Sequence, residues 1–181
     1  MKIFISAASS RGEFIGSIGE VVDSPEFRER HQHIFIPLEP SPSHDSTLMN
    51  RIESAILQSG LILMDVTPEQ VTVGDGNRWV TNQGVLIEYG LIQGFGWIHK
   101  LCVFCEARVN REHIHPAIHK SVDQYSIADL ATFKENVRTI IRVRERRIEE
   151  QALQSDLTWI RAATTQAGSL SPYRDVGTGS R

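Results

Sequence analysis

Glu88 is a charged residue inside the apolar stripe of a helix predicted over residues 81–95. On a helical wheel at ~100° per residue, its apolar neighbours are Val85, Leu91, Ile92 and Phe95. The polar residues Tyr89 and Gln93 fall on a different side. A buried carboxylate is costly unless it pairs with a cation, stays protonated or lies in a cleft where it does chemistry. The residues alone leave a structural salt bridge and a functional site equally open.

Three glycines in the same segment indicate that something approaches this helix closely. Gly84, Gly90 and Gly94 each weaken a helix by up to ~1 kcal/mol relative to alanine. We therefore expect another backbone or a ligand beside them.

The elements that position Glu88 follow from the apolar pattern. Four short apolar runs are predicted to be strands: residues 2–6, 33–38, 61–66 and 101–105. Most are continuous rather than alternating, which is typical of strands covered on both faces in a parallel sheet. Helical patterns fill the gaps, over residues 12–22, 45–58 and 81–95 and from residue 127 into the 150s. This alternation predicts a doubly wound α/β fold with a mostly parallel sheet of four to five strands and a long C-terminal helix.

The helix over residues 45–58 has a clear start and a clear apolar face. Asp45 or Ser46 can cap it, and its apolar face consists of Leu48, Ile52, Ala55 and Ile56. The proline-rich residues 39–44 before it are predicted to be an exposed loop.

Residues 66–80 are predicted to be a long loop that contains Thr67-Pro68 and the turn signal Gly74-Asp75-Gly76. The loop follows the third predicted strand. Open α/β sheets bind ligands outside the carboxyl ends of their strands, so a long loop there is predicted to be a binding loop.

Length and composition indicate one globular domain. The chain has 181 residues, with 40% hydrophobic and 23% charged residues and a net charge of -3, which gives no sign of a nucleic-acid partner. No apolar run reaches the length of about 18 residues that a membrane span needs, and the N-terminus is interpreted as a first strand rather than a signal peptide. We expect a cytoplasmic protein with an α/β domain over residues 1–126, a packing or oligomerising helical extension over residues 127–165 and a flexible tail over residues 166–181.

Neither the cysteines nor the histidines predict a metal site. Cys102 and Cys105 lie three apart in a predicted strand, so they should point to opposite faces, without a disulfide or a shared metal. His113, His115 and His119 have a spacing that could serve a metal. Pro116 interrupts any helix that would align them, and we predict no metal.

Two segments together resemble the nucleoside 2-deoxyribosyltransferase-like superfamily. They are residues 59–68 (SGLILMDVTP) and the pattern Asn82-x-Gly84-Val-x-x-Glu88-x-Gly90, followed by a strand after Gly96. The opening residues 2–10 (KIFISAASS) are similar to the first strand and loop of TIR domains. Arg78-Trp79, a few residues before the glutamate helix, is similar to a segment of the same fold. The resemblance covers roughly residues 1–106. It implies a flavodoxin-like, Rossmann-like architecture with a functional glutamate at residue 88.

The resemblance implies cleavage or transfer at the N-glycosidic bond of a nucleoside, a nucleotide or NAD, with NAD as a possible substrate and no cofactor. Glu88 would act as a nucleophile or stabilise the positive charge that develops on the sugar. Two alternatives are a nucleotide-binding sensor without turnover and a TIR-type interaction module. Members often complete the site with a second subunit, so a homo-oligomer is expected.

Further site residues are predicted from their positions. Asp65 could orient a sugar hydroxyl or protonate the departing base, or it could only cap the following turn. Asn82 could cap its helix, reach the ligand or do both, and Trp79 could stack on a base or pack as a lid. The residues predicted to bind substrate are Ser6, Ala7, Ser9, Arg11, Thr67, Trp79, Asn82 and Gly84. Those between Ser6 and Arg11 would supply backbone amides and a positive charge, or form an ordinary polar loop.

Overall fold

The computed structural model describes residues 1–36, 46–73, 76–118 and 121–169. The chain divides into two compact units, Met1–Ile141 and Arg142–Arg181. Several predictions therefore lie outside the described residues: the loop over residues 39–44, the Asp45 cap, the turn at Gly74-Asp75, His119 and most of the flexible tail.

The main sheet has five parallel strands in the order β2-β1-β3-β6-β7. They are β1 (Lys2–Ser6), β2 (Gln32–Phe35), β3 (Leu61–Asp65), β6 (Leu101–Glu106) and β7 (Val122–Tyr125). This order is that of a flavodoxin-like sheet, and it confirms the predicted α/β fold. All five residues of the central strand β3 are buried, as its continuous apolar sequence predicts.

The strand register brings four polar residues to one edge of the sheet. Ser6 pairs with Met64, Asp65 with Phe104, and Glu106 with Tyr125. In parallel strands the carboxyl ends meet at the same edge. Ser6, Asp65, Glu106 and Tyr125 thus end four neighbouring strands side by side.

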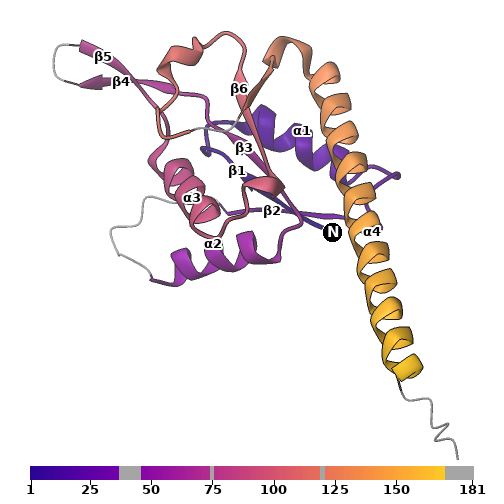
Figure 1. The fold of residues 1–181 in the computed structure, drawn as a ribbon. Coiled ribbons are helices and arrows are strands. Elements are labelled where there is room, and N and C mark those ends of the chain that lie inside the picture. The colour runs from indigo at the N-terminus through magenta and orange to yellow at the C-terminus, as the bar shows by residue number, and fades with distance from the viewer. Residues whose placement is uncertain (37–45, 74–75, 119–120, 170–181) are drawn as a thin grey trace, which may run out of the picture. The chain divides into compact units, whose positions relative to one another are not determined.

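Helices cover both faces of the sheet (Figure 1). On one face, α1 (Gly12–Val22) and the first part of α4 (Leu130–Ser169) pack on the strands through Phe14, Ile18, Val21, Phe133, Val137 and Ile141. On the other face, α2 (Ser46–Gln58) and α3 (Gln83–Gly94) pack through Ile52, Ala55, Ile56, Val85, Tyr89 and Ile92. Alternate strand residues supply the two cores, because successive side chains point to opposite faces.

The α4 residues in the first core place the end of the compact unit at Ile141, further along the chain than the boundary expected at residue 126. Phe133, Val137 and Ile141 are at most 2% exposed. In the second unit, α4 continues as a helix to Ser169, and the side chains of Leu153 and Trp159 are exposed.

The predicted loop over residues 66–80 contains a hairpin. Strands β4 (Glu69–Val73) and β5 (Gly76–Val80) pair in antiparallel fashion. The alternation of polar residues and valines before a Gly-Asp-Gly turn is a hairpin signal, which the loop prediction overlooked.

Four elements were not predicted from the sequence: β7 and the short 3₁₀ helices η1 (Ile98–Lys100), η2 (Arg111–His113) and η3 (Ile127–Asp129). For the strand predicted over residues 33–38, the structure gives β2 as Gln32–Phe35, and residues 37 and 38 lie outside the described part. No helix within the described ranges is long and apolar enough to cross a membrane.

The two cysteines point to opposite faces of β6, as predicted. Cys102 packs against the core beneath α1 and α4, and Cys105 belongs to the core beneath α2 and α3. Both are thiols. At Gly90 and Gly94 an added Cβ would meet no atom of the described residues within 4 Å beyond its own stretch of helix, so no other described backbone approaches these two glycines.

Candidate functional site

The helix that carries Glu88 begins at a side-chain cap. Asn82 Oδ1 accepts hydrogen bonds from Gly84 N at 2.9 Å and from Val85 N at 3.3 Å. These bonds satisfy two of the amides that a helix start leaves without partners. The predicted capping role of Asn82 is confirmed.

Glu88 lies on the buried face of α3 and is 4% exposed. Its predicted place inside the apolar stripe is confirmed. Tyr89 was predicted to lie on a different side of the helix from the apolar stripe. This prediction was wrong, because the Tyr89 ring is also buried and packs with Ile92 in the core. A phenol ring carries enough apolar surface to belong on this face; its hydroxyl accepts a hydrogen bond from Gln93 Nε2 at 3.2 Å.

Ser6 is the described partner of the Glu88 carboxyl. Ser6 Oγ donates a hydrogen bond to Glu88 Oε2, and within the described ranges no cation lies within ion-pair distance of this carboxyl. Burial raises the pKa of Glu88 from 4.5 to about 7, while the Ser6 hydroxyl opposes the shift. Near neutral pH the carboxyl is therefore divided between its acid and carboxylate forms. The structural salt bridge considered for Glu88 is therefore not formed among the described residues.

Asp65 is held by a different set of residues. Its Oδ1 accepts hydrogen bonds from the Thr67 amide, at 2.9 Å, and from the Thr67 hydroxyl. Its Oδ2 accepts a hydrogen bond from Tyr125 Oη at 2.8 Å. Burial raises the pKa of Asp65, and the hydrogen bonds from Thr67 and Tyr125 oppose that rise. The contact with the Thr67 amide is the turn-capping arrangement considered for Asp65.

Arg11 links this cluster to the hairpin. Its Nη2 donates to the carbonyl oxygens of Thr67 and Pro68, both at 3.3 Å. Its Nε lies 3.8 Å from Asp65 Oδ2 and 3.9 Å from Glu69 Oε1. Arg11 therefore holds the chain leaving β3 in place.

The two carboxyls predicted to be catalytic project to opposite faces of the sheet. Ser6 lies two residues after Phe4 and therefore on the same face of the sheet, the one covered by α2 and α3, where it contacts Glu88. Asp65 follows Leu63 on the α1 and α4 face, since side chains alternate along a strand. The structure thus brings Ser6 and Glu88 together in one cluster and Asp65, Thr67 and Arg11 in another.

The remaining predicted residues are more exposed. Ser9 is exposed, and Ala7, Asn82 and Gly84 are half-buried. Tyr125 was not among the predicted site residues, because the short polar sequence of β7 gave no strand signal and its partner Asp65 is far away in the sequence. Glu106 was also missed; it ends β6 buried and pairs with Arg108 at 2.9 Å.

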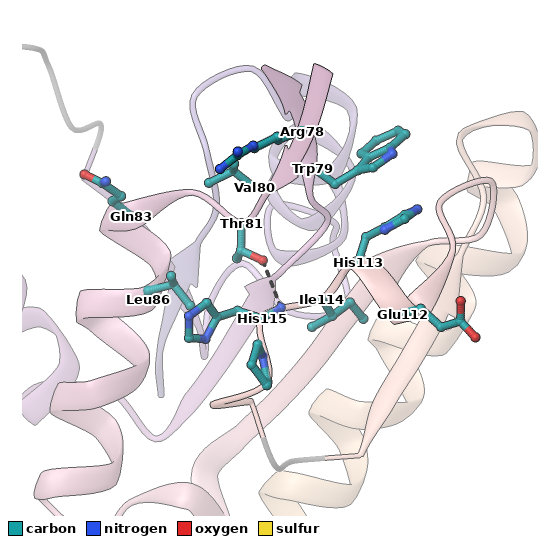
Figure 2. Close-up of a pocket in the computed structure, with 11 residues that line it drawn as sticks. Arg78, Trp79, Val80, Thr81, Gln83, Leu86, Glu112, His113, Ile114 and His115 are labelled. Carbon is teal, nitrogen blue, oxygen red and sulfur yellow. Dashed lines mark hydrogen bonds between the residues drawn. The ribbon is translucent and has the colours of Figure 1, made fainter. Parts of the chain in front are cut away.

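Trp79 lines a separate cleft of about 650 Å³ beside the hairpin (Figure 2). Its ring stacks on His113, with centroids 5.1 Å apart and an interplanar angle of 11°. The neighbouring Thr81 is buried, and its hydroxyl accepts a hydrogen bond from the His115 amide at 3.3 Å. The cleft therefore lies between β5, the start of α3 and the segment that contains η2.

Over the described ranges, no three His, Cys, Asp or Glu side chains gather to hold a metal ion. Comparison with known protein families and with curated protein sequences finds no family model and no relative that matches this chain.

Proposed function

We propose that this protein cleaves or transfers the N-glycosidic bond of a nucleoside, a nucleotide or NAD, with Glu88 beneath the anomeric carbon. The observation that carries the proposal is the buried Glu88 carboxyl, which has a serine hydroxyl but no described cation as its partner. It lies beside the carboxyl end of β1, at the edge where open α/β sheets bind ligands. A structural carboxylate at such a position would ordinarily be neutralised by a cation.

The chemistry follows from the charge of the transition state. As the bond from the anomeric carbon to the base nitrogen breaks, its electron pair leaves with the base and positive charge develops on the sugar. A carboxylate close to that carbon lowers the energy of this charge. Glu88 can then form a bond to the anomeric carbon, which water or an acceptor base later displaces.

The pKa of about 7 at Glu88 suits a substrate that is already cationic. A positively charged pyridinium riboside favours the carboxylate form by direct attraction. Its base also leaves as a neutral molecule and needs no proton. NAD is therefore the first substrate to test, followed by deoxynucleosides, whose bases need a proton as they depart.

Asp65 remains a predicted second catalytic residue. Its contacts with Thr67, Tyr125 and Arg11 favour a positioning role, in which it shapes the segment that leads into the hairpin. The proposal also includes a cytoplasmic setting, with which the two thiols are compatible, and self-association of the chain.

The test is product analysis with the full chain at high protein concentration. The protein is incubated with NAD and with several 2′-deoxynucleosides, and free nicotinamide or nucleobase is measured by chromatography. We expect release of at least one base, and its loss in Glu88→Gln. Glu106→Gln is the matched control, because Glu106 is also a buried glutamate at the same edge of the sheet; it should stay active.

The outcomes separate the alternatives. Release of a base that survives in Glu88→Gln overturns the role of Glu88. Substrate binding that needs Glu88 but yields no product supports a nucleotide sensor instead. If the protein neither binds nor cleaves any of these compounds, both forms of the proposal fail.

A further inference from the structure

The cleft beside the hairpin is on a different side of α3 from Glu88. Leu86 lines the cleft, whereas Glu88 lies on the buried face that contacts Ser6. At ~100° per residue, two positions along a helix are about 200° apart. A ligand in the cleft would therefore not occupy the site proposed for catalysis.

One wall of the cleft is an aromatic shelf. Trp79 is 40% exposed and stacks face to face on His113, with 5.1 Å between the ring centroids. Figure 2 shows both residues at the same end of the cleft. A partly exposed indole whose orientation is fixed by a second ring offers a flat apolar surface at little further entropic cost. Planar heteroaromatic rings stack on such surfaces.

The other end of the cleft carries a positive charge. Arg78 precedes Trp79 in β5, so the two side chains leave the strand on opposite sides, and in Figure 2 the guanidinium points away from the shelf. Arg78 forms no ion pair or hydrogen bond with another residue that the structure describes. Glu112, the acidic residue of the lining, already accepts a hydrogen bond from Asn110 Nδ2 at 3.1 Å. The cleft thus offers a ring surface and an anion-binding group at separate ends.

We infer that this cleft is a second ligand site, which takes a planar heteroaromatic ring joined to an anionic group, as in a mononucleotide. The ring would lie on the Trp79 and His113 shelf and the anion near Arg78. The volume of about 650 Å³ falls within the usual range of small-molecule sites, roughly 300–1,000 Å³. A ring alone or an anion alone would reach only one end.

The experiment measures binding to the full chain by isothermal titration calorimetry. The probes are the four common ribonucleoside 5′-monophosphates, together with adenosine, which lacks the anion, and ribose 5-phosphate, which lacks the ring. A variant with Trp97→Phe and Trp159→Phe leaves Trp79 as the single tryptophan, so its fluorescence reports on the shelf directly. We expect at least one mononucleotide to bind and to quench Trp79, and both partial probes to bind at least tenfold more weakly.

Substitutions then locate the site. Trp79→Leu and Arg78→Gln should each weaken mononucleotide binding about tenfold or more. Trp159→Leu and Arg28→Gln, which remove the same residue types outside the lining, should not. Glu88→Gln should leave this binding unchanged.

Three results overturn the inference: no saturable binding of any mononucleotide, binding that survives in Trp79→Leu and in Arg78→Gln, or binding that is lost in Glu88→Gln alone. The last would place the ligand at Glu88. Because the inference concerns binding only, it stands if base release is never observed, and it can fail while Glu88 is shown to be catalytic.

Discussion

The hydroxyl of Ser6, at the end of β1, donates a hydrogen bond to the Glu88 carboxyl on α3. This bond stabilises the carboxylate, whereas burial favours the protonated acid. Burial has the larger effect, and the pKa of Glu88 is raised to about 7. The protonation state of Glu88 can therefore change within the physiological range.

If Glu88 reacts as a carboxylate, kcat/KM for base release should rise with pH through a limb near pH 7, because the carboxylate fraction increases there. Ser6→Ala removes the hydrogen bond that lowers the pKa, so the limb should move to higher pH. Ser59→Ala is the matched control, since Ser59 is a buried serine at the opposite end of the strands whose hydroxyl donates to Ala55 O at 2.7 Å. A limb that stays in place in Ser6→Ala would contradict this coupling.

The same titration should affect stability. Because the pKa of Glu88 is raised on folding, from 4.5 to about 7, the folded chain binds this proton more tightly than the unfolded chain. The free energy of unfolding should therefore fall as pH rises from 5 to 8, by roughly 2–3 kcal/mol from this residue. Glu88→Gln should lack this decrease.

Urea denaturation of both proteins at pH 5 and pH 8 measures the difference. Other groups titrate in both proteins, so their contributions cancel in the comparison; Asp65, whose pKa is also raised, is one of them. If the two proteins have equal pH dependence, the Glu88 carboxyl is not desolvated in solution.

Tyr125→Phe should destabilise the protein by about 1–3 kcal/mol, because Asp65 Oδ2 would lose its buried hydroxyl donor. Tyr89→Phe is the comparison. The Tyr89 hydroxyl accepts a hydrogen bond from the neutral side-chain amide of Gln93, and the loss of such a neutral bond should cost about 1 kcal/mol. Thermal melts give the melting temperatures of the unmodified protein, Tyr125→Phe and Tyr89→Phe, which rank their stabilities. Equal losses would show that the Tyr125 bond to Asp65 is no stronger than an ordinary one.

Asn82 allows the capping role to be separated from ligand binding. Asn82→Ala should lower stability by about 1 kcal/mol, because two helix amides lose their acceptor, whereas Asn82→Ser should keep most of the cap. Stability and kcat/KM are measured for both variants. A serine variant that is stable but inactive would assign a substrate contact to the Asn82 amide group, and one that keeps its activity would restrict Asn82 to the cap.

The packing of α4 predicts where the chain can be shortened. A chain that ends at residue 126 lacks Phe133, Val137 and Ile141, all deep in the core, and should not fold. A chain that ends at Ile141 should melt cooperatively. Circular dichroism tests both, and size-exclusion chromatography of the longer one shows whether residues from Arg142 onward are needed for self-association.

The fold could be predicted largely from the sequence because its strands are buried on both faces. The runs that became β1, β3 and β6 are rich in consecutive Ile, Leu, Val and Phe, a pattern typical of strands covered on both faces. The edge strand β7 (VDQY) has mixed polarity, because one side of an edge strand can face water. Its pairing with β6 depends on tertiary contacts that no local pattern encodes.

The candidate site could likewise be predicted only where local sequence determines it. The position of Glu88 followed from helical periodicity, and the cap at Asn82 followed from residue type. The partners of each carboxyl could not be predicted, since Ser6 and Tyr125 reach Glu88 and Asp65 only when strands distant in the sequence align. That Asp65 and Ser6 point to opposite faces depends on strand register, which a shift of one residue would reverse.

The cysteines of β6 give each face of the sheet its own chemical reporter. Cys105 is in the same core as Val85 and Ile92 of the Glu88 helix, and its burial raises the pKa of its thiol. Cys102 packs against the other core. Because an exposed thiolate attacks alkylating reagents, the alkylation rate of the buried Cys105 measures how frequently α2 and α3 separate from the sheet, and the half-buried Cys102 provides the comparison on the other face. The two layers can thus be compared without introducing a label.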